Sequence, residues 1–175
     1  MAKNCLNKLI SNITVDCTIP LVGVKAIYLM HAEDVGFTYL SDWQVNTVVF
    51  AEGAKSYKVE GYKQNIQVTS SLKTTDASAR VDTSVTFKIP YNYLGRKFIN
   101  ALASGKFCVL VEFNDGGYTV HGDASPLECS SADFDSNANA KMVTITLASP
   151  EGSAGNHLMG IMPSAVNTIK SRVGV

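Results

Sequence analysis

The sequence predicts a mostly β fold, a β-sandwich or barrel of antiparallel strands with one flanking α-helix. Apolar and polar residues alternate with a period of two over most of the chain, and the alternating segments are bounded by Gly, Asp or Pro. Only one segment has the periodicity of a helix. A chain of 175 residues can bury a core without disulfides or metal. We therefore expect one β-rich domain over residues 1–150, followed by a C-terminal arm over residues 151–175.

Four short strands are expected before the first long hairpin, each between turn-forming Gly, Asp or Pro residues. A last pair of strands is expected to close the domain. The early strands cover residues 13–19, 24–31, 44–50 and 56–59, and the last pair covers residues 127–134 and 142–147.

The first long hairpin pairs residues 64–72 with residues 81–89. When Leu72 is placed opposite Val81, the apolar residues of both strands fall on one face. The connection, residues 73–80, is longer and more polar than a tight turn requires, so we expect a protruding hairpin loop. The polar face of this hairpin carries Gln67, Thr69, Ser71, Asp82, Ser84 and Thr86, together with Lys88.

Residues 91–104 are predicted to form the helix that packs on the sheet. Asn92 can cap its first turn, and Gly105 can end it. Apolar residues at helical spacing form one stripe, which we expect to face the sheet. The stripe consists of Leu94, Phe98, Ile99 and Leu102.

A shorter hairpin is expected directly after the helix. Residues 107–113 pair with residues 118–123 across an Asp-Gly turn of the primed type, which places Val111 opposite Val120. In this register one strand face carries Cys108, His121 and Asp123.

Residue types that carry catalysis or bind metal do not form a site in this sequence. A Cys108–His121–Asp123 arrangement would need oxyanion donors and a water-free setting, and an exposed strand face supplies neither. The carboxylates beside His31 have no second cluster at metal-ligand spacing. Cys5, Cys17, Cys108 and Cys129 form no CxxC pair, which is typical of reduced and mostly buried thiols. The sequence predicts no enzyme, no cofactor and no metal.

The composition is electrically balanced and rich in hydroxyl groups. Lys plus Arg and Asp plus Glu both number 15, which argues against a general nucleic-acid binder. Charged residues make up 17% of the chain, and Ser, Thr and Asn fill the difference from an average protein. Net charge normally keeps proteins apart. We therefore expect other subunits to cover much of this surface.

The first 15 residues lack the apolar stretch of a secretory signal, and no apolar segment is long enough to cross a bilayer. The sequence therefore predicts an intracellular product without membrane partners.

Residues 151–175 differ in character from the rest of the chain. They are too apolar for a solvated linker and too rich in Gly and Pro for a regular element. We expect an arm that becomes ordered against a neighbouring subunit; the alternative is a terminal strand or short helix docked on the chain's own domain. The apolar residues assigned to the arm are Leu158, Met159, Ile161, Met162, Val166 and Ile169.

Three segments late in the domain follow the order strand, tight hairpin, Gly-Asp connection, polar loop and terminal strand. They are KFCVLVEFNDGGYTVHGD (residues 106–123), LECSSADFDS (127–136) and MVTITLASPE (142–151). In this order the chain resembles bacteriophage tail tube or tail ring proteins, with those of crAss-like phages among the candidates. The likeness covers residues 57–150.

The resemblance implies a structural virion protein that forms a homo-oligomeric ring, typically hexameric, around a lumen for DNA passage without sequence-specific binding. It implies other phage tail or neck proteins as partners, a location in the virion tail, and assembly in the host bacterial cytoplasm. The polar face of the long hairpin would line the lumen. The hairpin loop would contact the next ring through Lys73, Thr74, Thr75, Asp76, Ser78 and Arg80.

A second hypothesis stays open beside this one. A non-catalytic β-sandwich module could bind carbohydrate or protein through an aromatic platform. Its candidate residues are Tyr39, Trp43, Tyr57 and Tyr62.

Overall fold

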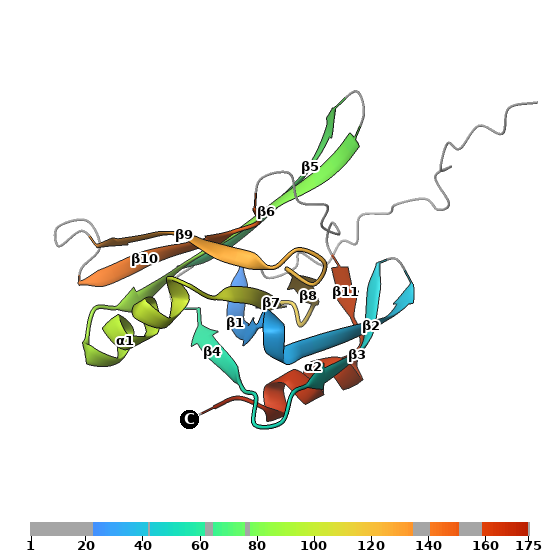
Figure 1. Ribbon diagram of the computed structural model, residues 1–175, viewed down its shortest axis with the longest axis horizontal. Helices are drawn as coiled ribbons and strands as arrows, with labels where there is room; N and C mark the ends of the chain where they lie inside the picture. The colour runs from blue at the N-terminus through green and yellow to red at the C-terminus, as the bar shows by residue number, and fades with distance from the viewer. Residues whose placement is uncertain are drawn as a thin grey trace, which may run out of the picture.

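The computed structural model describes residues 23–41, 43–61, 65–75, 78–134, 141–150 and 159–174. Within these residues, eleven strands form one hydrogen-bonded sheet that folds into two layers, and two α-helices pack on it (Figure 1). The predicted mostly β fold with a flanking helix is confirmed. The strand expected at residues 13–19 lies outside the described residues.

The first layer is built around a central strand, β7, which pairs with β1 on one side and β8 on the other. Strand β11 pairs antiparallel with β8 and parallel with β3. A short 3-10 helix, η1 (Ala32–Asp34), joins β1 to β2. In order, the layer contains β4 (Ser56–Glu60), β1 (Val24–His31), β7 (Lys106–Phe113), β8 (Tyr118–His121), β11 (Met159–Ile161), β3 (Gln44–Phe50) and β2 (Val35–Ser41).

The second layer is joined to the first through β9. The start of β9 pairs with β7, at Lys106 opposite Glu128 and Phe107 opposite Leu127, and the strand then pairs with β10. Strands β5 and β6 continue beyond the body of the molecule as a two-stranded ribbon (Figure 1). In order, the layer contains β9 (Leu127–Phe134), β10 (Met142–Ala148), β6 (Ser78–Pro90) and β5 (Ile66–Thr75).

One hydrophobic core lies between the two layers. Buried residues alternate with half-buried ones along β6 and β10, so each of these strands turns one face to this core. Phe87, Leu127 and Ile145 are fully buried there. Helix α1 (Tyr93–Leu102) covers one end of the core and contributes Leu102.

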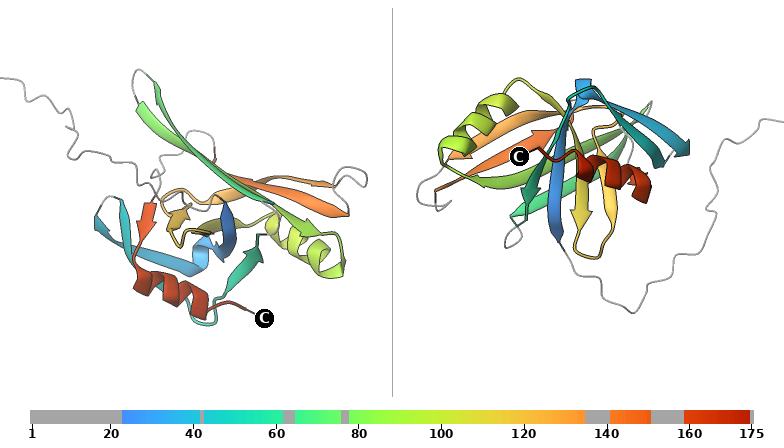
Figure 2. Two further views of the ribbon diagram at one scale, coloured as in Figure 1. Left: turned by 180° about the vertical axis from the view of Figure 1, so that it is seen from behind. Right: turned by 90° about the horizontal axis from the view of Figure 1, so that it is seen from below.

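A second core lies on the opposite face of the first layer, under helix α2 (Pro163–Ser171) (Figure 2). Strands β1 and β7 are therefore covered on both faces, and residues 26–30 and 107–112 are buried without alternation. Fully buried Met159 and Ile169 belong to this core. In the sequence, the central strands therefore form nearly continuous apolar runs and do not alternate.

The C-terminal residues do not form the predicted arm in this structure. Strand β11 lies between β3 and β8, and α2 packs on the second core, so the alternative of a strand and helix docked on the chain's own domain describes residues 159–171. Of the residues assigned to the arm, Leu158 lies outside the described residues and Met162 is half-buried. The others are buried in the second core: Met159 and Ile161 because β11 lies between β3 and β8, and Val166 and Ile169 because α2 packs on that core.

The β7–β8 hairpin has a register one residue away from the predicted one. Val111 lies opposite Thr119 instead of Val120. The Phe113 N–H donates to the Gly117 carbonyl, and Gly116 adopts a φ of 87°. A three-residue loop with a left-handed last residue thus replaces the expected two-residue turn.

The β5–β6 hairpin has the predicted register, with Leu72 opposite Val81. The protruding loop was expected over residues 73–80, and this boundary is wrong. Backbone pairing continues to Thr75 opposite Ser78, so the projection is a paired ribbon and not an open loop. Cross-strand backbone hydrogen bonds need no apolar side chains. The polar sequence of residues 73–80 therefore gave no sign that the two strands continue.

Helix α1 is shorter than predicted, and its apolar stripe is only partly covered. Leu102 is buried, and Phe98 and Ile99 are half-buried. Leu94 is 72% exposed, against the expectation that it packs on the sheet. No helix among the described residues is long and apolar enough to span a membrane.

Replacing Asn92 with alanine is expected to lower the free energy of unfolding by about 1 kcal/mol. Asn92 caps α1, because its Oδ1 accepts a hydrogen bond from the Gly95 N–H at 2.8 Å. Alanine leaves this amide without its partner. Urea unfolding followed by circular dichroism measures the effect, and exposed Asn100, replaced in the same way, is the control. Equal midpoints for the two variants would contradict the capping role.

Candidate functional site

One face of the second layer is polar, and no described helix or strand lies over it (Figures 1 and 2). The cross-strand pairs align Gln67, Thr86, Thr146 and Ser131 in one row across β5, β6, β10 and β9. The hydroxyl oxygens of Thr86 and Thr146 are 3.2 Å apart. This hydroxyl-rich surface is called the polar face below.

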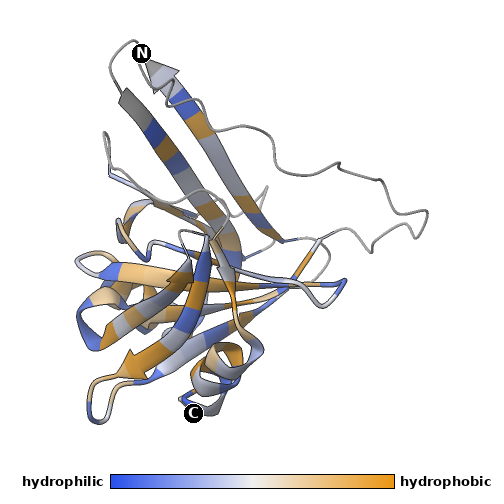
Figure 3. Cartoon of the chain, turned by 90° about the vertical axis from the view of Figure 1, so that its right-hand side faces the viewer, coloured by the Kyte–Doolittle hydropathy of each residue, from blue (hydrophilic) through white to orange (hydrophobic). Residues whose placement is uncertain are grey.

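The structure brings together the six residues of the long hairpin that were expected to line a lumen. They share one side because they form three directly opposite pairs, two residues apart along each strand. Figure 3 shows the corresponding alternation of hydrophilic and hydrophobic residues along the two strands. The pairs are Gln67–Thr86, Thr69–Ser84 and Ser71–Asp82.

The base of the projecting ribbon carries a partly exposed charge cluster. Lys73 Nζ lies 2.6 Å from Asp82 Oδ2, and Arg80 Nε lies 3.7 Å from Asp82 Oδ1. The hydrogen bond from Lys73 lowers the pKa of Asp82 below its usual value. Among the residues assigned to ring contacts, Asp76 lies outside the described residues, whereas Lys73, Thr74 and Arg80 lie on the ribbon.

A buried charge cluster, which the sequence analysis did not identify, ties α2 to the first layer. The Glu112 side chain is 6% exposed and lies 3.0 Å from both Lys25 Nζ and Lys170 Nζ. The Tyr28 hydroxyl donates to Glu112 Oε2 at 2.9 Å, and Lys170 Nζ donates to the Tyr118 hydroxyl at 2.8 Å. The Lys170 ammonium also lies 4.7 Å from the centre of the Tyr118 ring.

The charges of this cluster are strongly coupled. Burial alone would raise the pKa of Glu112, but hydrogen bonds from Lys25, Lys170 and Tyr28 outweigh it and lower the pKa to about 2. Burial, together with the neighbouring carboxylate, raises the pKa of Tyr28 to about 12. The cluster therefore holds a charged carboxylate at neutral pH and serves to fix α2 in place. Its sequence signal is a single acid in the otherwise apolar run 107–113.

The structure separates the residues of the hypothetical Cys–His–Asp arrangement. Because of the shifted register, Cys108 faces the second core, whereas His121 lies opposite Val109 of the first core. The Cys108 thiol donates to the Gly122 carbonyl at 3.1 Å, and burial raises its pKa to about 12. The His121 Nε2 lies 3.0 Å from the Thr119 hydroxyl. The two side chains cannot form a nucleophile and base pair in this arrangement.

Candidate residues for metal or ligand binding are also dispersed. Within the described ranges, no group of three or more His, Cys, Asp or Glu residues could hold a metal ion. Of the proposed aromatic platform, Tyr39 and Trp43 are exposed near the tip of the β2–β3 hairpin, but Tyr57 lines a hollow beside α1. Tyr62 lies outside the described residues. No single platform forms from the described members.

Family models, curated proteins and solved structures were compared with the chain. No match is found in any of the three.

Proposed function

We propose that this chain is a structural virion protein, a subunit of a phage tail tube or tail ring that encloses a lumen for DNA passage. The polar face carries this proposal. Its central row consists of uncharged Gln67, Thr86, Thr146 and Ser131. Neutral hydroxyl and amide groups release no counterions from DNA, so a lumen lined by them attracts the phosphate backbone weakly.

The free edges of the second layer support assembly into a ring. One edge is β5, which pairs only with β6 in the described part of the chain. Among the described residues, the other edge is the far half of β9, because β7 pairs with β9 only at Glu128 and Leu127. These edges differ from each other, so pairing β5 of one copy with β9 of the next is a head-to-tail contact that can close into a ring. A hexamer is the expected ring.

The ribbon suits contact with a second ring. It extends past the body of the molecule, and its charged base would lie at the ring's rim if the polar face lined the lumen (Figure 1). In this arrangement Lys73, Thr74 and Arg80 reach a neighbouring ring, with other tail or neck proteins as further partners.

Negative-stain electron microscopy and light scattering of the purified full chain test the proposal. We expect rings or stacked tubes. Replacing residues 73–80 with Asn-Gly ends the ribbon at the Leu72–Val81 pair and is expected to leave rings but abolish stacks. Lys97→Glu, on the exposed side of α1 and outside the ribbon, is the control and should stack normally.

Uniform monomers at assembly concentrations would overturn the proposed function. If such monomers also bound oligosaccharides, the alternative of a carbohydrate-binding module would replace it. Stacks that persist without residues 73–80 would exclude the ribbon from the contact between rings.

A further inference from the structure

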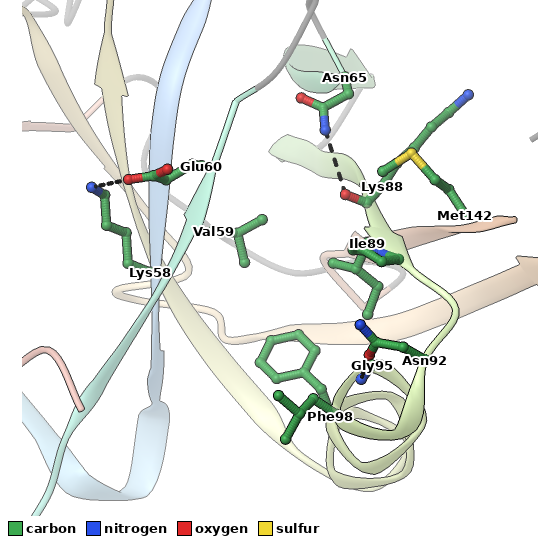
Figure 4. Close-up of a pocket in the computed structure, with 12 residues that line it drawn as sticks. Lys58, Val59, Glu60, Asn65, Lys88, Ile89, Asn92, Gly95, Phe98 and Met142 are labelled. Carbon is green, nitrogen blue, oxygen red and sulfur yellow. Dashed lines mark hydrogen bonds and ion pairs between the residues drawn. The ribbon is translucent and has the colours of Figure 1, made fainter. Parts of the chain in front are cut away.

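An apolar hollow opens between helix α1 and strand β4. Val59 from β4 and Phe98 from α1 point toward it, whereas Lys58 and Glu60 point away (Figure 4). The hollow has a volume of about 730 Å³, and Leu94, which is 72% exposed, borders it. A cavity of this size and lining suits a large apolar side chain. We call it the α1–β4 hollow; its apolar lining includes Val59, Ile89, Leu94, Phe98 and Met142.

The tip of the β2–β3 hairpin presents an exposed tryptophan. Ser41 lies opposite Gln44, so Trp43 is at the turn, where it is 65% exposed. Its backbone is held in place, because the Gly160 N–H of β11 donates to the Trp43 carbonyl at 2.9 Å. An aromatic side chain on a fixed backbone loses little entropy on binding, and such residues are typical anchors of protein interfaces.

The hairpin and the α1 region carry opposite charges. Residues 32–54, which contain the hairpin, include four acidic residues and no basic one. Residues 83–111, which contain α1, include four basic residues and no acidic one. Asp123 adds a carboxylate beside the hairpin, where its Oδ2 accepts from the Tyr39 hydroxyl at 3.2 Å, and Lys88 lines the α1–β4 hollow. Two copies are therefore attracted through unlike ends and repelled through like ends.

Three charged residues near the two ends lie outside this contact. Glu60 forms an ion pair with Lys58 at 2.6 Å and points away from the α1–β4 hollow (Figure 4). Arg172 lies over the Phe50 ring, at the opposite end of the hairpin from the tip. Lys97 lines a separate hollow of about 460 Å³. None of the three changes the opposite signs of the hairpin tip and the α1–β4 hollow.

The two sites lie at opposite ends of the molecule. Helix α1 is at one end and the β2–β3 hairpin at the other in each of the three views (Figures 1 and 2). Strand β3 pairs with β11, which holds the hairpin in the first layer. Trp43 therefore cannot reach the hollow of its own chain. Two different sites at opposite ends join copies head to tail.

We propose that Trp43 of one copy inserts into the α1–β4 hollow of a neighbouring copy in the same ring. Burial of the indole ring against Leu94 and Phe98 supplies the affinity, and the opposite charges orient the two copies. This contact rests on the self-assembly in the proposed function, but it uses neither the β5 edge nor the β9 edge. It accounts for the exposure of both Trp43 and Leu94 at the two ends of one subunit.

Cross-linking between two cysteine probes tests the proposal. Leu40→Cys, beside the hairpin tip, and Met142→Cys, in the α1–β4 hollow, are made as separate proteins. In both, Cys5, Cys17 and Cys129 are replaced by serine, and the remaining native cysteine is buried. The two proteins are mixed while dilute, concentrated so that they assemble, and treated with a short bis-maleimide. We expect a cross-linked dimer from the mixture and none from either variant alone.

A second substitution identifies the anchor. Adding Trp43→Ala to the Leu40→Cys protein should abolish the cross-link. Val49→Ala is the matched control and should leave it intact, because Val49 is 62% exposed on the same hairpin but pairs away from the tip, opposite Gly36. A cross-link that survives Trp43→Ala would refute insertion of the tryptophan.

Each other outcome overturns a defined part of the proposal. Equal dimer yields from either variant alone and from the mixture would contradict a head-to-tail contact. Rings in negative stain without a cross-link in the mixture would refute this contact and leave the proposed function standing. Absence of any oligomer in light scattering would refute both.

Discussion

Replacing Glu112 with glutamine is expected to lower the free energy of unfolding by about 3 kcal/mol, because it removes one partner from a buried charge cluster. The carboxylate is 6% exposed and lies 3.0 Å from each of two ammonium groups. Lys170 lies on α2 and is less exposed than Lys25. Because water compensates its charge less well, Lys170 loses more stabilisation than Lys25 when the carboxylate is removed. Urea unfolding of the wild type and the variant at pH 7 measures the difference.

An exposed ion pair provides the control for this result. Glu60 Oε1 lies 2.6 Å from Lys58 Nζ, but the Glu60 side chain is 74% exposed. Solvent screens such a pair, so Glu60→Gln should leave the midpoint unchanged. If the two variants shifted the midpoint equally, burial would not be what makes the Glu112 cluster stabilising.

The same cluster makes stability depend on pH in the acid range. Because the pKa of Glu112 is about 2 in the folded protein and 4.5 for a free glutamate side chain, its contribution is complete above about pH 4.5 and is lost as the pH falls toward 2. Other acids also titrate there, so the quantity to measure is the difference between wild type and Glu112→Gln. This difference should shrink as the pH falls. A difference that stays constant down to pH 2 would contradict the assignment of the lowered pKa to Glu112.

The β5–β6 and β7–β8 hairpins show what sequence alternation can determine. In β5–β6 one face is apolar and the other polar, so a shift of one residue would bury polar side chains, and the predicted register is confirmed. In β7 residues 107–112 are buried on both faces. An apolar pattern cannot select between two apolar faces. The loop geometry at Gly116 decided the register instead, and it separated Cys108 from His121.

The candidate site likewise has features that the sequence could predict and features that it could not. The polar face could be predicted because it follows from local alternation, and Asn92 could be predicted because capping is local. Strand β11 could not, because its three residues are held by β3 and β8 from distant parts of the chain. The Glu112 cluster depends on β1, β7, β8 and α2 meeting at one place, and only the acid itself is visible in the sequence.

Replacing Ile169 with alanine is expected to lower the free energy of unfolding of the monomer by about 3 kcal/mol. Ile169 is fully buried in the second core, and its carbonyl accepts a hydrogen bond from the Ser56 hydroxyl at 2.8 Å. Truncation leaves a cavity that the sheet above α2 cannot close. Chemical unfolding of dilute protein measures the loss, and exposed Asn167→Ala on the same helix should change stability by less than about 0.5 kcal/mol. If the C-terminal residues were instead an arm ordered only by a neighbour, dilute Ile169→Ala and wild-type protein would unfold at the same denaturant concentration, because the side chain would have no partner within its own chain.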